Sequence, residues 1–267
     1  MSLSNRVILN KRILNRVSSS KSVRKTCSFL LRASFVLCFY VAPALAGYRP
    51  PRTARLPQGP AIPGGRRGGC AMPANVNLTA LSPQSHVGRT QSLQPTLAWF
   101  VPSEVSYELT LQLYEYGDNN WTKIDQRSLG QSRYGYMHYT LPSSLNLSTG
   151  NLYRWHIVLA CDPSRPSASQ VASAQFEIVP AQVSSATLEN NLQLAEQYSD
   201  VGLWYDAIAA LSSQSDSSEV INRSEATAYL SQFLLDAALL DEANTSPPVL
   251  STPSPLRQIA SLLTEER

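Results

Sequence analysis

The chain has 267 residues, of which 22 are basic and 19 acidic, so its formal net charge at pH 7 is +3. The basic excess lies at the start, where eight Lys and Arg residues and no Asp or Glu precede residue 47. Without that segment 14 basic and 19 acidic residues remain, a net charge of about −5. Binding to nucleic acid needs a clustered basic surface, so the composition argues against a nucleic-acid partner.

The first 46 residues have the three parts of a secretory signal. An apolar stretch over residues 29–45, interrupted only by Arg32, follows the basic start and ends in Ala44-Leu45-Ala46. A basic start, a short apolar run and small residues at the cleavage positions are typical of a signal peptide. We therefore predict a signal peptide over residues 1–46, cleaved between Ala46 and Gly47.

The length of the apolar run argues against a permanent membrane anchor. The uninterrupted part, residues 33–45, has 13 residues, whereas a membrane-spanning helix needs about 20. We therefore expect no stable membrane span once the signal is removed. The long basic start leaves an organelle transit peptide as an alternative.

Two of the four cysteines lie in the predicted signal, so the mature chain keeps Cys70 and Cys161. Exported compartments are oxidising, and an even pair of cysteines there favours a disulfide. Two separate thiols, or a bridge between chains, are the alternatives. The sequence has only three histidines and neither a C-x-x-C nor an H-x-x-x-H motif, so we expect no metal and no other cofactor.

Residues 47–75 are rich in Pro, Gly and Arg and contain few large apolar side chains. Such a segment cannot bury enough surface to offset the entropy lost on ordering. We predict a flexible arm, in which Arg66 and Arg67 are candidate contacts for an anionic lipid, a polysaccharide or a protein partner. A solvated linker without a partner is the alternative.

From residue 76 to residue 180 apolar and polar residues alternate with the period of a strand. Residues 107–113 alternate, the turn 117–120 follows, and residues 121–129 return, which predicts a hairpin. Further strands are expected at residues 97–101, 136–141, 153–161 and 174–178. Together they predict an antiparallel immunoglobulin/fibronectin-III-like β-sandwich.

One corner of this sandwich has a recognisable pattern. Residues 145–155 resemble the corner before strand F of fibronectin-III-like domains, where a tyrosine packs inward and its hydroxyl bonds the preceding loop. Tyr153 has this place in the present sequence. Cys161 falls in phase with the core face, so a bridge to Cys70 would fix the end of the arm to the sandwich.

After Pro180 the period becomes helical, and we predict a helical subdomain over residues 181–243. Residues 194–211 resemble one tetratricopeptide unit, with small residues where the helices cross and Gly202 at the turn. One such unit cannot bury its face alone, so a third helix near residues 223–242 is the expected cover. A linker and a short C-terminal helix are expected over residues 244–267.

Aromatic side chains supply the remaining candidate contacts. Exposed aromatic residues on a sandwich stack on sugars or on a partner, whereas cross-strand pairs that stabilise the sheet are the alternative. On the helices, an aromatic pair at the start of the second helix is the candidate contact. The candidates are Tyr114, Tyr116, Trp121, Tyr134, Trp204 and Tyr205.

Signatures of common enzymes are absent from the sequence, which has no G-x-S-x-G, phosphate loop, dinucleotide fingerprint or EF-hand. The three histidines, His86, His138 and His156, fall in different predicted strands and loops, and His156 is expected on the outward face of its strand. We therefore predict a non-catalytic protein.

Four segments resemble the domain-of-unknown-function family 928 of exported cyanobacterial proteins. They are residues 64–70, 95–102, 153–166 and 204–207, within a resemblance that spans about residues 60–240. The resemblance implies a bacterial envelope or lumenal protein and no activity. We expect the mature protein in the periplasm, the thylakoid lumen or the extracellular space, acting as a protein-interaction module for an envelope protein. A carbohydrate-binding module that uses the aromatic hairpins is the alternative.

Overall fold

The computed structural model describes residues 47–58, 70–73, 76–184, 190–215, 220–244 and 253–265. All described residues belong to one compact unit, Ala46–Arg267. The predicted signal peptide, including Ala46, lies outside the described residues. Within the described ranges, no helix is long and apolar enough to cross a membrane.

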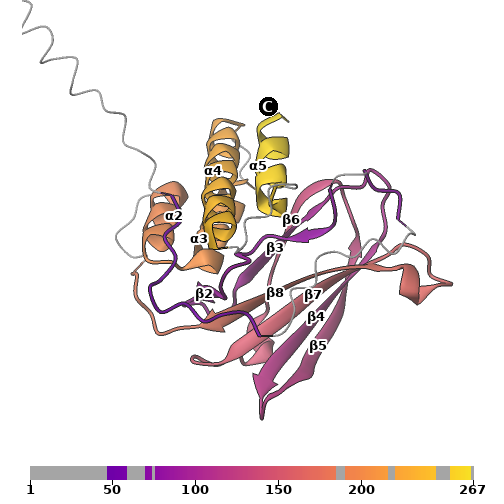
Figure 1. Cartoon of the computed structure of the whole chain (residues 1–267), viewed down its shortest axis with the longest axis horizontal. Coiled ribbons are helices and arrows are strands. Elements are labelled where there is room, and N and C mark those ends of the chain that lie inside the picture. The colour runs from indigo at the N-terminus through magenta and orange to yellow at the C-terminus, as the bar shows by residue number, and fades with distance from the viewer. Residues whose placement is uncertain are drawn as a thin grey trace, which may run out of the picture. The chain divides into compact units, whose positions relative to one another are not determined.

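The described strands form two sheets (Figure 1). One has the strand order β1-β3-β6, and the other has the order β2-β8-β7-β4-β5. The bounds are β1 Thr79–Ala80, β2 Gly88–Thr90, β3 Thr96–Val101, β4 Glu108–Gly117, β5 Asn120–Gln131, β6 Gly135–Thr140, β7 Leu152–Ala160 and β8 Gln170–Ile178. The predicted β-sandwich is therefore confirmed.

One strand pair departs from the antiparallel prediction. β2 runs parallel to β8, with Gly88 opposite Phe176 and Thr90 opposite Ile178. No hairpin joins these two strands, which lie at opposite ends of the sandwich sequence, so nothing local forces them to run in opposite directions. The other pairs are antiparallel.

Two local predictions about the sandwich are confirmed. The β4–β5 hairpin turns at Asp118 and Asn119, which have positive φ angles of 50° and 59°, as a two-residue hairpin turn requires. At the corner before β7, the Tyr153 hydroxyl accepts a hydrogen bond from the Ser148 N–H at 2.9 Å. The tyrosine ring is 1% exposed, so this side chain fastens the loop to the core.

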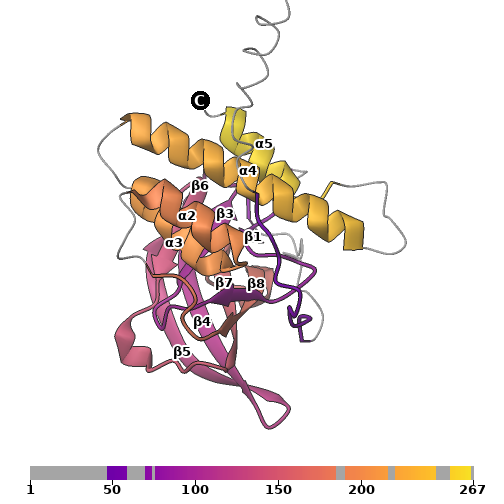
Figure 2. The ribbon, with the colours of Figure 1, turned by 90° about the vertical axis from the view of Figure 1, so that its left-hand side faces the viewer.

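Four helices follow the sandwich in the described part of the chain. They are α2 Asn191–Asp200, α3 Trp204–Ser215, α4 Val220–Asn244 and α5 Pro255–Glu265, so the expected third and last helices are both present. α3 contacts α2 and α4 on one side and β2 and β3 on the other. Figures 1 and 2 show the helices on the side of the three-stranded sheet. As a result all six residues of β3 are buried, and helices and sandwich share one hydrophobic core.

The start of α3 lies inside this shared core. Trp204 and Tyr205 are both 0% exposed. The Trp204 indole N–H donates to the Leu81 carbonyl at 3.0 Å, and the Tyr205 hydroxyl donates to the Gln175 carbonyl at 3.0 Å. The prediction that these two residues contact a partner is wrong, because their polar atoms are bonded within the chain and their rings fill the core.

Over residues 47–58 the N-terminal segment differs from the flexible arm that its composition predicts. Tyr48 is 4% exposed, and its ring packs edge-on against Trp204 and Phe233 at centroid distances of 4.9 and 5.4 Å. Its hydroxyl hydrogen-bonds His86 Nε2 at 2.7 Å. One aromatic side chain inserted in the core supplies the apolar burial that the rest of the segment lacks.

The predicted disulfide joins Cys70 to Cys161, with a Cα–Cα distance of 4.7 Å. Cys161 follows the last residue of β7, and the Ala71 N–H donates to the Tyr107 hydroxyl at 2.8 Å. The bridge therefore holds the chain entering the sandwich at the end of the five-stranded sheet.

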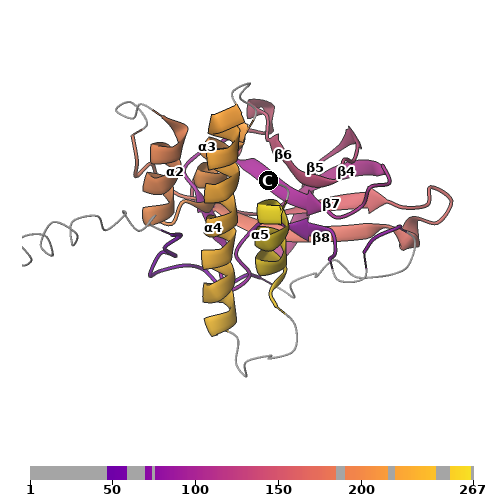
Figure 3. The same ribbon diagram turned by 90° about the horizontal axis from the view of Figure 1, so that it is seen from above.

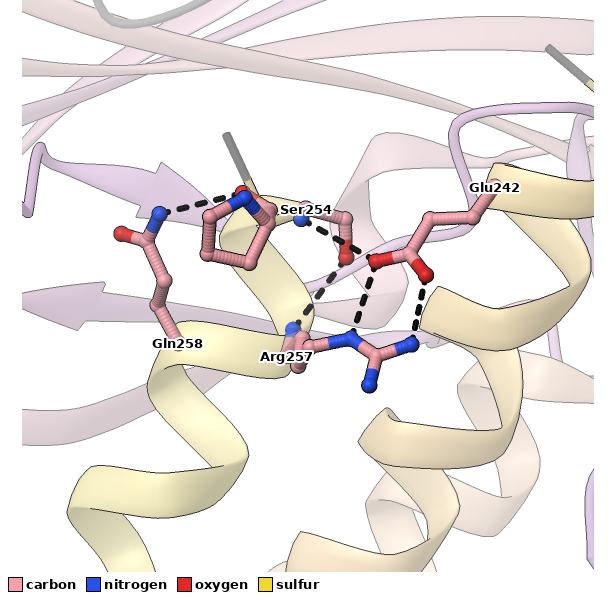
Figure 4. A network of polar contacts seen from close by, with 5 residues as sticks. Glu242, Ser254, Arg257 and Gln258 are labelled. Carbon is pink, nitrogen blue, oxygen red and sulfur yellow. Dashed lines mark hydrogen bonds and ion pairs between the residues drawn. The ribbon is translucent and has the colours of Figure 1, made fainter. Parts of the chain in front are cut away.

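The last two helices are joined by a small polar network (Figure 4). Arg257 of α5 makes a two-pronged contact with Glu242 of α4, at 2.9 Å from Nε and 2.5 Å from Nη2. The Ser254 N–H donates to the same carboxylate at 3.2 Å, and Gln258 reaches back to the Pro253 carbonyl. α5 packs beside α4, as Figure 3 shows from above. The network fixes the position of α5 along α4.

A buried carboxylate at the start of α3 gives a pH-dependent contribution to stability. Asp206 is 5% exposed, and its carboxylate accepts from the Gln91 N–H at 3.0 Å. Burial raises its pKa to about 6 against the opposing effect of these hydrogen bonds. Since the folded state prefers the protonated form, this contribution is complete below about pH 4 and is lost as pH rises through 6.

We therefore expect Asp206→Asn to flatten the change in unfolding free energy between pH 4 and pH 7, by up to about 3 kcal/mol. Urea denaturation at closely spaced pH values measures this difference. Asp200→Asn is the control, because Asp200 is an exposed residue at the end of α2. An unaltered slope in Asp206→Asn would contradict the assignment.

Candidate ligand-binding face of the five-stranded sheet

The outward residues of β4 and β7 follow from the strands' alternation. Leu113 of β4 and Trp155 of β7 are buried and opposite each other. Their sequence neighbours Tyr114 and Arg154, also paired, therefore lie on the outer face. By the same alternation Tyr116 and His156 lie outward.

The outward side chains form one cluster across three strands. Trp121 of β5 is paired with Tyr116, and their rings lie 5.0 Å apart. The Arg154 guanidinium lies 4.0 Å from the centre of the Trp121 ring, which is cation–π geometry. The rings of Tyr114 and His156 lie 4.9 Å apart. We call these five side chains the aromatic face.

Burial sets the charge state of the aromatic face. His156 has its pKa lowered to about 4, first by burial and second by the charge of Arg154. Its Nε2 atom is buried and has no hydrogen-bond partner among the described residues. At neutral pH the imidazole is therefore uncharged, and Arg154 is the positive group of the cluster.

The N-terminal segment borders this face. The Gln58 carbonyl accepts hydrogen bonds from the Arg154 guanidinium and from Gln175 Nε2, the latter at 2.9 Å. The Gln58 N–H donates to Gln175 Oε1 at 3.0 Å. These contacts hold Arg154 in position over Trp121, so the charged part of the face is pre-organised.

The structure brings together only some of the predicted contact residues. Tyr114, Tyr116 and Trp121 gather on the aromatic face and are partly exposed. Tyr134, which is 37% exposed, lies apart from them, with its ring edge-on to Phe100 of the three-stranded sheet. Arg66 and Arg67 lie outside the described residues.

Sequence analysis missed Arg154 as a member of the site, and it expected His156 on the surface. His156 does lie on the outer face, but it is half-buried because Tyr114 covers it. The signal that would find both is their i, i+2 spacing on a strand opposite Tyr114. Using that signal needs the register between β4 and β7, which the sequence pattern alone does not supply.

A hollow of about 480 Å³ lies between the N-terminal segment and the end of α4. His86 and Asp241 line it, but both are engaged in holding the fold. His86 bonds the Tyr48 hydroxyl and Ser85 Oγ, and Asp241 accepts from the N–H groups of Gln84 and Ser85 at 2.9 and 2.8 Å. The polar groups that line this hollow therefore connect residues 84–86 to α4 and stabilise the fold.

Metal-binding groups do not gather in the described ranges, where no three His, Cys, Asp or Glu side chains lie close enough to hold an ion. The chemistry that the aromatic face offers is ring stacking, one cation and a few hydrogen-bonding groups. Aromatic rings and arginine are also enriched at protein interfaces in general.

The family model described as Domain of Unknown Function (DUF928) matches residues 62–247. The chain belongs to this family. In this DUF928 chain the matched range includes both cysteines of the disulfide, the whole aromatic face and helices α2 to α4. The description of the family assigns it no activity.

Comparison with solved structures finds, among others, the solution structure of the third fibronectin III domain of human KIAA0343 protein. It shares 8% identity with this DUF928 chain, and the match covers 48% of this chain and 99% of that chain, with a TM-score of 0.24. The sandwich described above therefore rests on the strand orders and registers of this chain itself. Comparison with curated proteins gives no match.

Proposed function

We propose that this protein is an exported, non-catalytic binding module of the cell envelope that contacts a protein partner through the aromatic face. The observation that carries the proposal is the cluster of partly exposed rings at Tyr114, Tyr116 and Trp121, with Arg154 held over Trp121. The export of the chain and the tetratricopeptide-like character of α2 and α3 are parts of the same proposal.

The composition of the aromatic face fits a protein interface. Tyr, Trp and Arg are enriched at the centres of such interfaces and dominate their energetics. Arg154 is fixed by the Gln58 carbonyl and by the Trp121 ring, so ordering it on binding costs little further entropy. Trp204 and Tyr205 are in the core, which excludes these two side chains as the contact.

A glycan ligand is the second candidate for the same face. Sugars stack on aromatic rings and bond polar groups beside them. The Tyr114 hydroxyl bonds Gln112 Oε1 at 2.8 Å next to the uncharged His156, which places polar groups among the rings.

The test uses the mature protein and two variants. Trp121→Ala is expected to weaken binding to an envelope protein at least tenfold, since aromatic residues at interface centres contribute about 2 kcal/mol or more. Leu239→Ala is the matched control, because Leu239 is 48% exposed on α4, away from the sheet. Circular dichroism confirms that each variant is folded.

Cross-linking in the envelope fraction identifies the partner, and titration of the purified pair measures the dissociation constant. Equal affinity of Trp121→Ala and the unaltered protein would refute the aromatic face as the contact. Binding to isolated envelope glycans, lost in Trp121→Ala and unaccompanied by any protein partner, would replace the first candidate by the second.

A further inference from the structure

The first described residue, Gly47, lies against a carboxylate. A Cβ atom added to Gly47 would lie 2.6 Å from Cγ and 3.3 Å from Cβ of Asp236, which is in α4. A side chain at this position would therefore require the Asp236 carboxylate to move. The Gly47 Cα is therefore next to the Asp236 carboxylate.

The neighbours of Gly47 hold it in this place. Tyr48 is inserted in the core, as described above, and the Arg49 N–H donates to the Ser199 carbonyl at 3.1 Å. Arg49 itself extends toward Asp200, with 3.6 Å between its guanidinium and that carboxylate. The approach of Gly47 to Asp236 is thus set by the fold of the residues that follow it.

The Asp236 carboxylate can accept further hydrogen bonds or an ion pair. One of its oxygens accepts from Gln232 Nε2 at 2.8 Å. Within the described ranges no Lys or Arg forms an ion pair with it. Partial burial raises the pKa of this carboxyl, because burial disfavours its charged form.

We propose that cleavage between Ala46 and Gly47 frees an α-amino group that pairs, as an ammonium ion, with the Asp236 carboxylate. This inference rests on the export that is part of the proposed function. Water supplies the atoms: its hydroxyl goes to the Ala46 carbonyl carbon, and its proton goes to the Gly47 nitrogen, which becomes charged at neutral pH. The removal of the signal thereby adds an ion pair to the fold.

The Ala44-Leu45-Ala46 pattern supports a cut before residue 47. The backbone nitrogen is only about 1.5 Å from Cα. A terminal ammonium on Gly47 is therefore within reach of the carboxylate that the fold has placed beside that Cα.

The test is a cycle of four mature proteins that begin at Gly47. The free and the α-acetylated amino terminus are each combined with Asp236 and with Asp236→Asn. We expect acetylation to lower the melting temperature by about 2–4 °C when Asp236 is present, the shift typical of a modest ion pair in a chain of this size. In Asp236→Asn we expect acetylation to have no effect.

A matched control is Asp200→Asn, which removes the carboxylate beside Arg49 and leaves the response to acetylation intact. Equal effects of acetylation in Asp236 and Asp236→Asn would overturn the ion pair, because the loss would then be steric. This comparison does not depend on any binding partner.

Amino-terminal sequencing of the protein recovered from the envelope fraction separates the two proposals. A terminus at Gly47 supports the cut. A terminus elsewhere on an exported protein would overturn this inference alone, whereas an uncleaved chain that stays inside the cell would overturn both it and the proposed export. A terminus at Gly47 without coupling to Asp236 would leave export standing and refute the ion pair.

Discussion

Replacing Trp204 with alanine is expected to lower the free energy of unfolding by about 3–5 kcal/mol. The side chain is fully buried, with its ring 4.3 Å from Phe233 and 4.9 Å from Tyr48. Its indole N–H satisfies the Leu81 carbonyl, so the substitution removes both apolar contacts and a buried hydrogen bond. The cavity would open where the N-terminal segment, the sandwich and α4 meet.

Chemical denaturation of the mature protein, followed by far-ultraviolet circular dichroism, measures this loss. Leu239→Ala is the control, since an exposed position on α4 is expected to change the free energy by no more than about 0.5 kcal/mol. Because the parts of the chain share one core, we also expect a single cooperative transition. A loss below about 1 kcal/mol, or separate transitions for strands and helices, would contradict the shared core.

The strands were predictable because half-buried strands leave a local signal. In β4 Leu109, Leu111 and Leu113 are buried, and in β7 every second residue from Tyr153 to Leu159 is buried, so the period of two is visible without any knowledge of the partner strands. The Asp118–Asn119 turn and the Tyr153 corner are likewise local, since each needs residues within a few positions of one another. Such features can be found in one sequence.

The errors concern contacts between distant segments. Tyr205 bonds Gln175 and Trp155, at sequence separations of 30 and 50, and Trp204 bonds Leu81 at a separation of 123. Nothing in the helical pattern of α3 distinguishes such buried aromatic residues from exposed ones. The burial of Tyr48 was missed for a related reason. The composition of residues 47–58 as a whole is polar, but the single buried side chain of Tyr48 fixes the position of this segment.

The candidate site likewise depends on contacts between segments that are distant in the sequence. A local excess of aromatic residues identified Tyr114, Tyr116 and Trp121, and the register of the hairpin pairs the last two. Arg154 and His156 join them only because β7 lies beside β4. The ring positions were therefore predictable as a group, whereas the charge over Trp121 and the uncharged imidazole depend on the tertiary fold.

Loss of the Cys70–Cys161 bridge is expected to lower the free energy of unfolding by about 2–4 kcal/mol. The two cysteines are 91 residues apart in sequence, so the bridge closes a long loop and removes much of the freedom of the unfolded chain. Denaturation of the mature protein with and without reductant measures the effect. The double variant Cys70→Ser, Cys161→Ser is expected to match the reduced protein and to show no response to reductant.

Mass spectrometry of the unreduced mature protein after alkylation gives an independent measurement, and two alkylated thiols would refute the bridge. The expected loss also bears on where the protein acts. The disulfide persists in oxidising compartments and is reduced in the cytosol, so a chain that is not exported would lack it.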